Sequence, residues 1–178
     1  MSKPVSAIVI MGVSGSGKTT AGRLLARELG WSFYDADDFQ PQLNIAKMTR
    51  GEPLDDADRE PWLEGLRALL DRPREEPERL VLACSALKER YRRKLGLGQG
   101  DPRLVYIKGS FELIAKRMRE RTDHFMKEGM LRSQFAALEE PVEGPPGEGA
   151  TLVVDASATP EDMVRSILLW LQSAELGS

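Results

Sequence analysis

The segment best suited to chemistry is an octapeptide near the start of the chain, Gly-Val-Ser-Gly-Ser-Gly-Lys-Thr at residues 12–19. It matches the pattern G-x-x-x-x-G-K-[ST], whose backbone N–H groups surround phosphate oxygens. In this pattern the lysine reaches the β- and γ-phosphates and the final hydroxyl can bind Mg²⁺. A helix beginning at Lys18 would add the positive end of its dipole. The residues expected to bind the nucleotide are Gly12, Val13, Ser14, Gly15, Ser16, Gly17, Lys18, Thr19 and Thr20.

An acidic cluster at residues 35–38 is the second candidate for chemistry. Asp35 and Asp37 follow an expected strand at 31–34, which we expect to lie beside the strand that precedes the octapeptide. Residues two apart at the end of a strand can point the same way, here toward the γ-phosphate. Asp35 could then orient hydrated Mg²⁺, and Asp37 could accept the proton of an attacking hydroxyl. The alternative role is capping of the next helix, which fits Asp38 best.

Two arginines could stabilise charge that develops during phosphoryl transfer. Arg117 and Arg121 are four residues apart in an expected helix at 111–121, so both can project from one face toward the triphosphate. Their planar guanidinium groups match phosphate oxygens better than a lysine does. A favourable interaction with the end of the helix dipole is the competing explanation.

The elements that must position these residues alternate between strand and helix. Expected strands cover 7–11, 31–34, 80–84, 104–107 and 151–154; expected helices cover 18–29, 43–50, 60–70, 86–95, 111–121, 130–138 and 160–171. This alternation predicts an α/β fold with a five-stranded parallel sheet between two layers of helices. The length of 178 residues favours one domain, 1–178. The Pro- and Gly-rich stretch 141–149 is expected to be a mobile loop.

Composition excludes several classes of protein. The net charge of −3 argues against a general nucleic-acid binder. A single cysteine (Cys84) and a single histidine (His124) leave no basis for an intramolecular disulfide or a zinc centre. Cys84 lies in an expected buried strand and should serve packing. No apolar stretch is long enough to span a membrane, and the N-terminal apolar run is too short for a secretory signal, so we expect a cytoplasmic protein.

Blocks in fixed order across residues 7–156 resemble the gluconokinase family. They are Met11–Thr19, Phe33–Asp37, Pro41–Met48, Gly51–Leu63, Ala83–Lys88, Arg117–Met126 and Ser133–Glu139. The resemblance implies a three-layer P-loop kinase fold with a helical lid around 111–140. It also implies ATP and Mg²⁺ as cofactors, and phosphorylation of D-gluconate at its C6 hydroxyl to give 6-phospho-D-gluconate and ADP. A homodimer is the expected assembly.

The resemblance further implies a pocket for the sugar acid beside the phosphate loop. Its expected ligands are Asp37, Arg59, Lys88, Arg92 and His124, with Lys88 and Arg92 sharing a helix face. Lys88 follows the end of a strand, where open α/β sheets place ligands. Family members often carry histidine where this chain has Gln40, and glutamine cannot titrate near neutral pH.

Two alternatives stay open at this point. One is a kinase for another small hydroxy acid, such as a shikimate-type enzyme. The other is a nucleotide-dependent switch without phosphoryl transfer, although the N-K-x-D sequence of GTPases is absent: the chain has Asn-Ile-Ala-Lys at 44–47.

Overall fold

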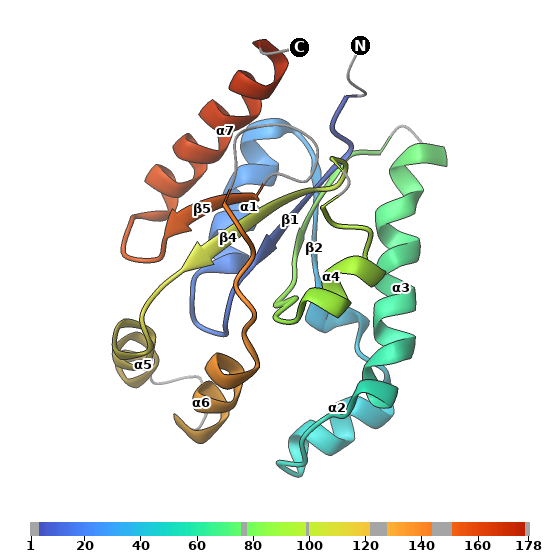
Figure 1. Cartoon of the computed structure of the whole chain (residues 1–178), viewed down its shortest axis with the longest axis vertical. Helices are drawn as coiled ribbons and strands as arrows, with labels where there is room; N and C mark the ends of the chain where they lie inside the picture. The colour runs from blue at the N-terminus through green and yellow to red at the C-terminus, as the bar shows by residue number, and fades with distance from the viewer. Residues whose placement is uncertain (1–3, 76–77, 99, 122–127, 144–150, 177–178) are drawn as a thin grey trace.

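Strands and helices alternate along the part of the chain that the computed structural model describes, residues 4–75, 78–98, 100–121, 128–143 and 151–176 (Figure 1). The strands are β1 (Ala7–Met11), β2 (Ser32–Asp35), β3 (Leu80–Ala83), β4 (Arg103–Lys108) and β5 (Thr151–Asp155). The helices are α1 (Lys18–Leu29), α2 (Gln42–Thr49), α3 (Asp56–Glu75), α4 (Glu89–Lys94), α5 (Phe111–Glu120), α6 (Glu128–Ala137) and α7 (Pro160–Leu176), with a 3-10 turn η1 (Ala36–Phe39) after β2.

The five strands form one parallel sheet in the order β2-β3-β1-β4-β5. The predicted α/β class and the five-stranded parallel sheet are confirmed. The predicted neighbour of β2 was wrong, because β3 lies between β2 and β1: Ala83 pairs with Ile10 on one side and with Asp35 on the other. The acidic cluster is therefore one strand further from β1 than we expected.

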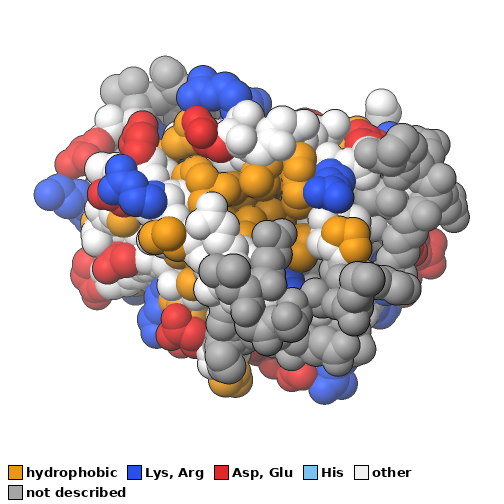
Figure 2. Space-filling view, turned by 90° about the horizontal axis from the view of Figure 1, so that it is seen from above, with side chains coloured by type: hydrophobic (Ala, Val, Ile, Leu, Met, Phe, Trp, Pro, Cys, Tyr) orange, Lys and Arg blue, Asp and Glu red, His pale blue; other side chains and the backbone are white. Residues whose placement is uncertain are grey.

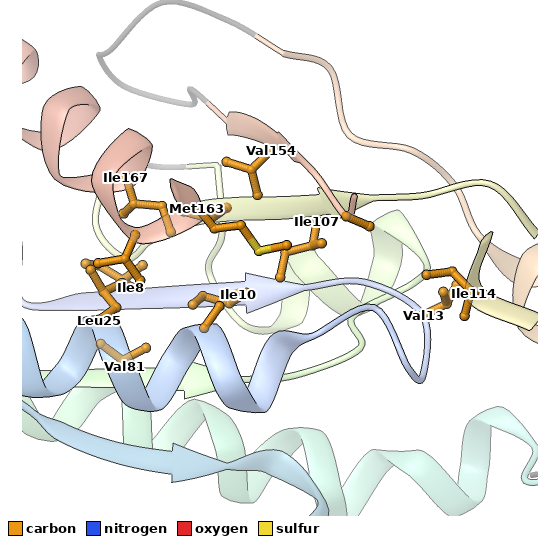
Figure 3. Close-up of a cluster of buried hydrophobic side chains, with 14 of the residues drawn as sticks. Ile8, Ile10, Val13, Leu25, Val81, Ile107, Ile114, Val154, Met163 and Ile167 are labelled. Carbon is orange, nitrogen blue, oxygen red and sulfur yellow. The ribbon is translucent and has the colours of Figure 1, made fainter. Parts of the chain in front are cut away.

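The central strand β1 is buried on both faces, and alternate side chains enter two different cores. Ile8 and Ile10 pack with α1 and α7 on one face, in the cluster drawn in Figure 3. Ala7, Val9 and Met11 pack with α3 and α4 on the other face. A strand covered on both sides needs a continuous apolar run, which explains the sequence Ala-Ile-Val-Ile-Met. The layers are thus helix, sheet, helix.

The two ends of the sheet differ. At the carboxyl ends of the strands lie the loop after β1, the turn η1 and the helices α2, α5 and α6, in the lower half of Figure 1. Seen from the opposite end, where the strands begin, the surface shows a patch of hydrophobic side chains bordered by Lys and Arg (Figure 2). Among the described residues, no helix combines the length and the apolar composition that a membrane span requires. The polar groups described below all gather at the carboxyl end.

The packing of α7 gives a direct test of this core. Ile167 is completely buried, whereas Leu169, two residues along the same helix, is 61% exposed. Ile167→Ala should lower the free energy of unfolding by about 2–5 kcal/mol, because it removes buried methyl groups and leaves a cavity. Urea denaturation followed by circular dichroism measures the change. Leu169→Ala is the matched control, and an equal loss in both variants would contradict the assigned packing of α7.

Candidate active site

The loop between β1 and α1 has the backbone conformation of a phosphate cradle. Gly15 and Gly17 adopt left-handed φ angles of 80° and 104°, which glycine tolerates best. A Cβ at Gly15 would lie 3.2 Å from Cγ of Met118 and 3.3 Å from Cγ2 of Ile114, so α5 packs closely against the loop. Gly17 is the N-cap of α1 and has no side chain to block the helix N-terminus. The loop can therefore present its N–H groups to an anion.

Lys18 lies folded along this loop. Its Nζ donates hydrogen bonds of 2.9 Å to the carbonyl oxygens of Gly12 and Val13. Burial lowers the pKa of Lys18, and the nearby carboxylates of Asp37 and Asp35 oppose that shift. The ammonium group of Lys18 is partly buried and attracts the negative charge of an approaching phosphate. Lys18 is thus placed to bind a phosphate group that enters the cradle.

Asp35 connects the phosphate loop to the turn η1. Its Oδ2 accepts a hydrogen bond of 2.9 Å from Oγ1 of Thr19, and its Oδ1 accepts one of 3.0 Å from the backbone N–H of Asp37. The capping role that we assigned to Asp38 belongs to Asp35, which is the N-cap of η1. Thr19, Asp35 and Asp37 are thus brought together even though β3 separates β2 from β1.

Asp37 follows the strand, as we expected, but it lies in the first turn of η1, so the extended backbone that would point Asp35 and Asp37 the same way is absent. Asp37 is exposed in this turn, but partial loss of solvent around its carboxylate raises its pKa; the negative charge of Asp35 adds to this shift, and Lys18 opposes it. A carboxylate whose proton affinity is increased in this way is a better proton acceptor than an ordinary surface aspartate. Asp37 therefore stays our candidate for the general base.

Three cationic side chains surround the buried ring of Tyr91 on α4. The guanidinium carbons of Arg59 and Arg90 lie 5.4 Å from the ring centroid, and Nζ of Lys88 lies 5.8 Å from it. The carboxylate of Asp56 pairs with Arg90 and accepts a hydrogen bond of 2.8 Å from the Tyr91 hydroxyl. Asp56 thus compensates the charge of Arg90.

The charge of Asp56 also acts on Arg59 and Lys88, but it is not paired directly with either of them. Within the described residues, neither side chain forms an ion pair or a hydrogen bond, and Nε of Arg59 is buried without an acceptor. A buried donor without a partner costs free energy unless a ligand satisfies it. This pair of cations is suited to a carboxylate ligand.

The position of Arg59 relative to Asp37 is set by the first turns of α3. Trp62, one turn after Arg59, is buried, and its Nε1 donates a hydrogen bond of 2.8 Å to the carbonyl oxygen of Ala36. Ala36 directly precedes Asp37 in η1. The tryptophan therefore holds the start of α3 against the turn that carries the candidate base.

Arg92 does not share a helix face with Lys88, contrary to our expectation. The helix begins at Glu89 instead of residue 86, because Ala86 has a left-handed φ of 44° and Lys88 is the extended N-cap. The guanidinium group of Arg92 is buried and donates to the carbonyl oxygens of Ala86, Leu87 and Glu139 at 2.7–3.1 Å. Arg92 is therefore a structural residue that shapes the Lys88 loop, and we remove it from the candidate ligands.

Arg117 and Arg121, the two arginines of the lid region, do not lie on one helix face either. Hydrogen bonds from Ser157 lower the pKa of Asp155, at the end of β5, and the positive charge of Arg117 on α5 adds to this shift. Arg121 is the C-cap of α5 with an extended backbone (φ −91°, ψ 111°), so the shared helix face that we predicted is wrong. The roles of both in phosphoryl transfer stay predictions. His124 lies outside the described residues.

A polar network that we did not predict holds α2 against α3. Nδ2 of the buried Asn44 donates to Oε1 of Gln40 at 3.0 Å and to the carbonyl oxygen of Asp58 at 2.7 Å, and Lys47 pairs with the Asp58 carboxylate at 2.9 Å. Because its oxygen is occupied by Asn44, Gln40 presents its N–H groups to other partners. The spacing of Asn44 and Lys47, one helical turn apart, was the signal available in the sequence.

A second residue that sequence reasoning left without a role is Gln134 on α6. Its Oε1 accepts a hydrogen bond of 2.7 Å from the backbone N–H of Ser14, and its Nε2 lies 3.0 Å from Oγ of Ser14. The two residues are 120 positions apart in the chain. No local pattern reports such a contact.

Two oxygens near the phosphate loop could contribute to a metal site. The described residues contain no group of three or more His, Cys, Asp or Glu side chains that could hold a metal ion. Mg²⁺ in phosphate sites commonly takes one or two protein oxygens and completes its shell with water and phosphate. The adjacent oxygens of Thr19 and Asp35, 2.9 Å apart, fit that pattern.

Comparisons with known proteins agree with this geometry. The shikimate kinase family model matches residues 14–172. The probable gluconokinase of Rattus norvegicus is 47% identical over 152 residues, which are 75% of this chain and 82% of that protein. The thermoresistant gluconokinase of Escherichia coli (strain K12) is 40% identical over 160 residues, which are 90% of each.

Solved structures extend the similarity to three dimensions. A gluconokinase from Sinorhizobium meliloti 1021 superposes with a TM-score of 0.81 at 38% identity, over 98% of this chain and 97% of that one. A shikimate kinase from Aquifex aeolicus shares the fold, with a TM-score of 0.57 at 22% identity over 97% of this chain and 99% of that one. The phosphate loop, the paired aspartates and these similarities together establish that the chain belongs to the gluconokinase family of P-loop phosphotransferases.

Proposed function

We propose that this protein transfers the γ-phosphoryl group of ATP to the C6 hydroxyl of D-gluconate, giving 6-phospho-D-gluconate and ADP. The observation that supports the proposal is the contact of Asp35 with both the phosphate loop and the turn of the candidate base: Asp35 accepts hydrogen bonds from the Thr19 hydroxyl and from the backbone N–H of Asp37. The choice of gluconate follows the names of relatives that are 40–47% identical.

In the proposed reaction, Asp37 accepts the proton of the C6 hydroxyl as the oxygen attacks the γ-phosphorus. The bond between the γ-phosphorus and the β–γ bridging oxygen breaks, and ADP leaves. Lys18 stabilises the negative charge that moves onto the phosphate oxygens, and Arg117 and Arg121 are proposed to assist from the lid region. Thr19 and Asp35 would hold Mg²⁺, which when bound neutralises charge on the β- and γ-phosphates.

The other end of the acceptor is proposed to lie against Arg59 and Lys88. Gluconate carries its carboxylate at C1, the opposite end of the carbon chain from the hydroxyl that reacts. Two cations without protein partners suit that carboxylate, and the fork of Arg59 can bind both of its oxygens. Helices α5 and α6, in the proposed lid at 111–140, would limit the access of water to the reacting groups.

The test is ADP release from ATP with a panel of acceptors that includes gluconate, shikimate, other sugar acids and no acceptor. We expect release that depends on gluconate, with a new phosphomonoester signal in ³¹P NMR. Release with shikimate but not gluconate would replace the proposed acceptor. Failure of every acceptor to stimulate ADP release would refute phosphoryl transfer.

A further inference from the structure

We propose that Gln134 is a positioning residue for phosphoryl transfer, which fixes the tip of the phosphate loop through Ser14. The inference rests on the proposed function for its kinetic consequences, but not for its effect on nucleotide binding. It concerns a residue outside the octapeptide, on a helix more than a hundred residues further along the chain.

The contact uses both polar atoms of the Gln134 amide. Oε1 accepts from the backbone N–H of Ser14 at 2.7 Å, and Nε2 donates to Oγ of Ser14 at 3.0 Å. Rotating the amide by 180° would place an NH₂ group against the backbone N–H, so one orientation is strongly preferred. The pair therefore fixes both the backbone and the hydroxyl of Ser14.

The tip of the loop is held from two sides. At Gly15, the side chains of Met118 and Ile114 on α5 would lie only 3.2 and 3.3 Å from an added Cβ, so α5 leaves no room for a side chain on this side of the loop. At Ser14, the next residue, the support comes from the hydrogen bonds of Gln134 on α6. A phosphate cradle works through the directions of its N–H groups, so a loop that can tilt binds the γ-phosphate less well and aligns it less often.

Gln134 can serve as a fixed support because the end of α6 is itself anchored. Five residues later, the backbone N–H of Glu139 donates to the carbonyl oxygen of Leu87 at 2.8 Å, and the carbonyl oxygen of Glu139 accepts from Arg92 at 2.7 Å. Oε1 of Glu139 also accepts from the backbone N–H of Glu89 at 3.2 Å. These bonds join α6 to the loop that carries Lys88, so a single segment contacts both the acceptor side and the phosphate side of the site.

Two substitutions separate the hydrogen bonds from simple packing. Gln134→Ala removes the whole amide, and Gln134→Met keeps the length of the side chain without its polar atoms. We expect both to weaken binding of a non-hydrolysable ATP analogue and to lower kcat/KM for ATP by about 10-fold, the loss of two hydrogen bonds of ordinary strength. The affinity for gluconate in the absence of nucleotide should stay unchanged.

Ser133→Ala is the matched control, because Ser133 is exposed on the same helix and bonds only within it, to the carbonyl oxygen of Gly129. Parental nucleotide affinity in Gln134→Met would show that the side chain acts by packing, and would overturn the proposal. So would equal losses in Gln134→Met and Ser133→Ala.

A double-mutant cycle with Ser14→Ala adds a second readout. Ser14→Ala removes the hydroxyl partner and leaves the backbone N–H, so its effect on nucleotide affinity should be smaller in the Gln134→Ala background than in the parental chain. Fully additive effects would contradict a direct contact. Weakened nucleotide binding in Gln134→Ala, combined with no turnover of gluconate by the parental chain, would refute the proposed function and leave only the support of the nucleotide-binding loop by Gln134 standing.

Discussion

Replacing Asp37 by asparagine is expected to lower kcat for gluconate phosphorylation by roughly 10²–10⁴-fold, the usual contribution of a positioned general base. Asparagine has nearly the same shape but cannot accept the proton of the attacking hydroxyl. It also removes a negative charge close to Lys18, so the affinity for ATP should not fall. Single-turnover kinetics and a separate binding measurement with ATP distinguish the two effects.

Asp38 supplies the matched control for this experiment. It is exposed in the same 3-10 turn, and Asp38→Asn removes the same charge one position away. We expect Asp38→Asn to keep most of the parental kcat. If Asp37→Asn also kept it, Asp37 could not be the proton acceptor.

The raised pKa of Asp37 predicts a particular pH dependence. Only the ionised carboxylate can accept a proton, and its population falls as the pH drops through the pKa of the folded protein. Because that pKa lies above the ordinary aspartate value of 3.8, kcat/KM for gluconate should begin to fall at a higher pH than an unperturbed carboxylate would give. A pH profile measured at saturating ATP checks this fall of kcat/KM on the acidic side. The residual activity of Asp37→Asn should not show the fall.

The fold could be predicted from the sequence largely because its signals are local. The apolar run at 7–11, the octapeptide at 12–19 and the helical spacing that follows each predict a local structure, and β1, the phosphate loop and α1 lie at these positions. The strand order could not be read in this way. Whether β3 pairs with β1 depends on contacts between segments about 70 residues apart, such as Ala7 with Leu80.

The residues of the candidate site also divide into those with a local sequence signal and those placed by contacts between distant segments. Lys18, Thr19 and Asp35 could be predicted as a group because the octapeptide and the end of a strand fix them. Arg92 was assigned to the wrong environment because the backbone turn at Ala86 delays the start of α4, and a pattern of four-residue spacing does not reveal such a turn. Gln134 was missed for the opposite reason: its partner Ser14 is known only once α6 is placed against the phosphate loop.

Loss of the Arg59 guanidinium is the second large effect that we expect. Truncating one partner of a desolvated charge pair commonly costs 2–5 kcal/mol, so Arg59→Ala should lower kcat/KM for gluconate by about 30-fold or more. The affinity for ATP in the absence of gluconate should not change. Arg90→Ala is the matched control, because Arg90 lies at the same distance from the Tyr91 ring as Arg59 but is already paired with Asp56. Equal losses in the two variants would show that the cations act only by stabilising Tyr91.

A neutral acceptor makes this prediction specific for the carboxylate. Glucitol has the hydroxyls of gluconate at C2 to C6 but carries a neutral hydroxyl at C1 in place of the carboxylate. It therefore cannot form an ion pair with Arg59. The parental chain should prefer gluconate strongly, and Arg59→Ala should reduce that preference by lowering the activity with gluconate alone. Arg59→Lys should recover only part of it, because an ammonium group restores the charge but not the two parallel hydrogen bonds of a guanidinium fork. An unchanged ratio of the two activities in Arg59→Ala would place the carboxylate elsewhere, and Lys88 would be the next cation to test, since it also lies against the Tyr91 ring without a carboxylate partner among the described residues.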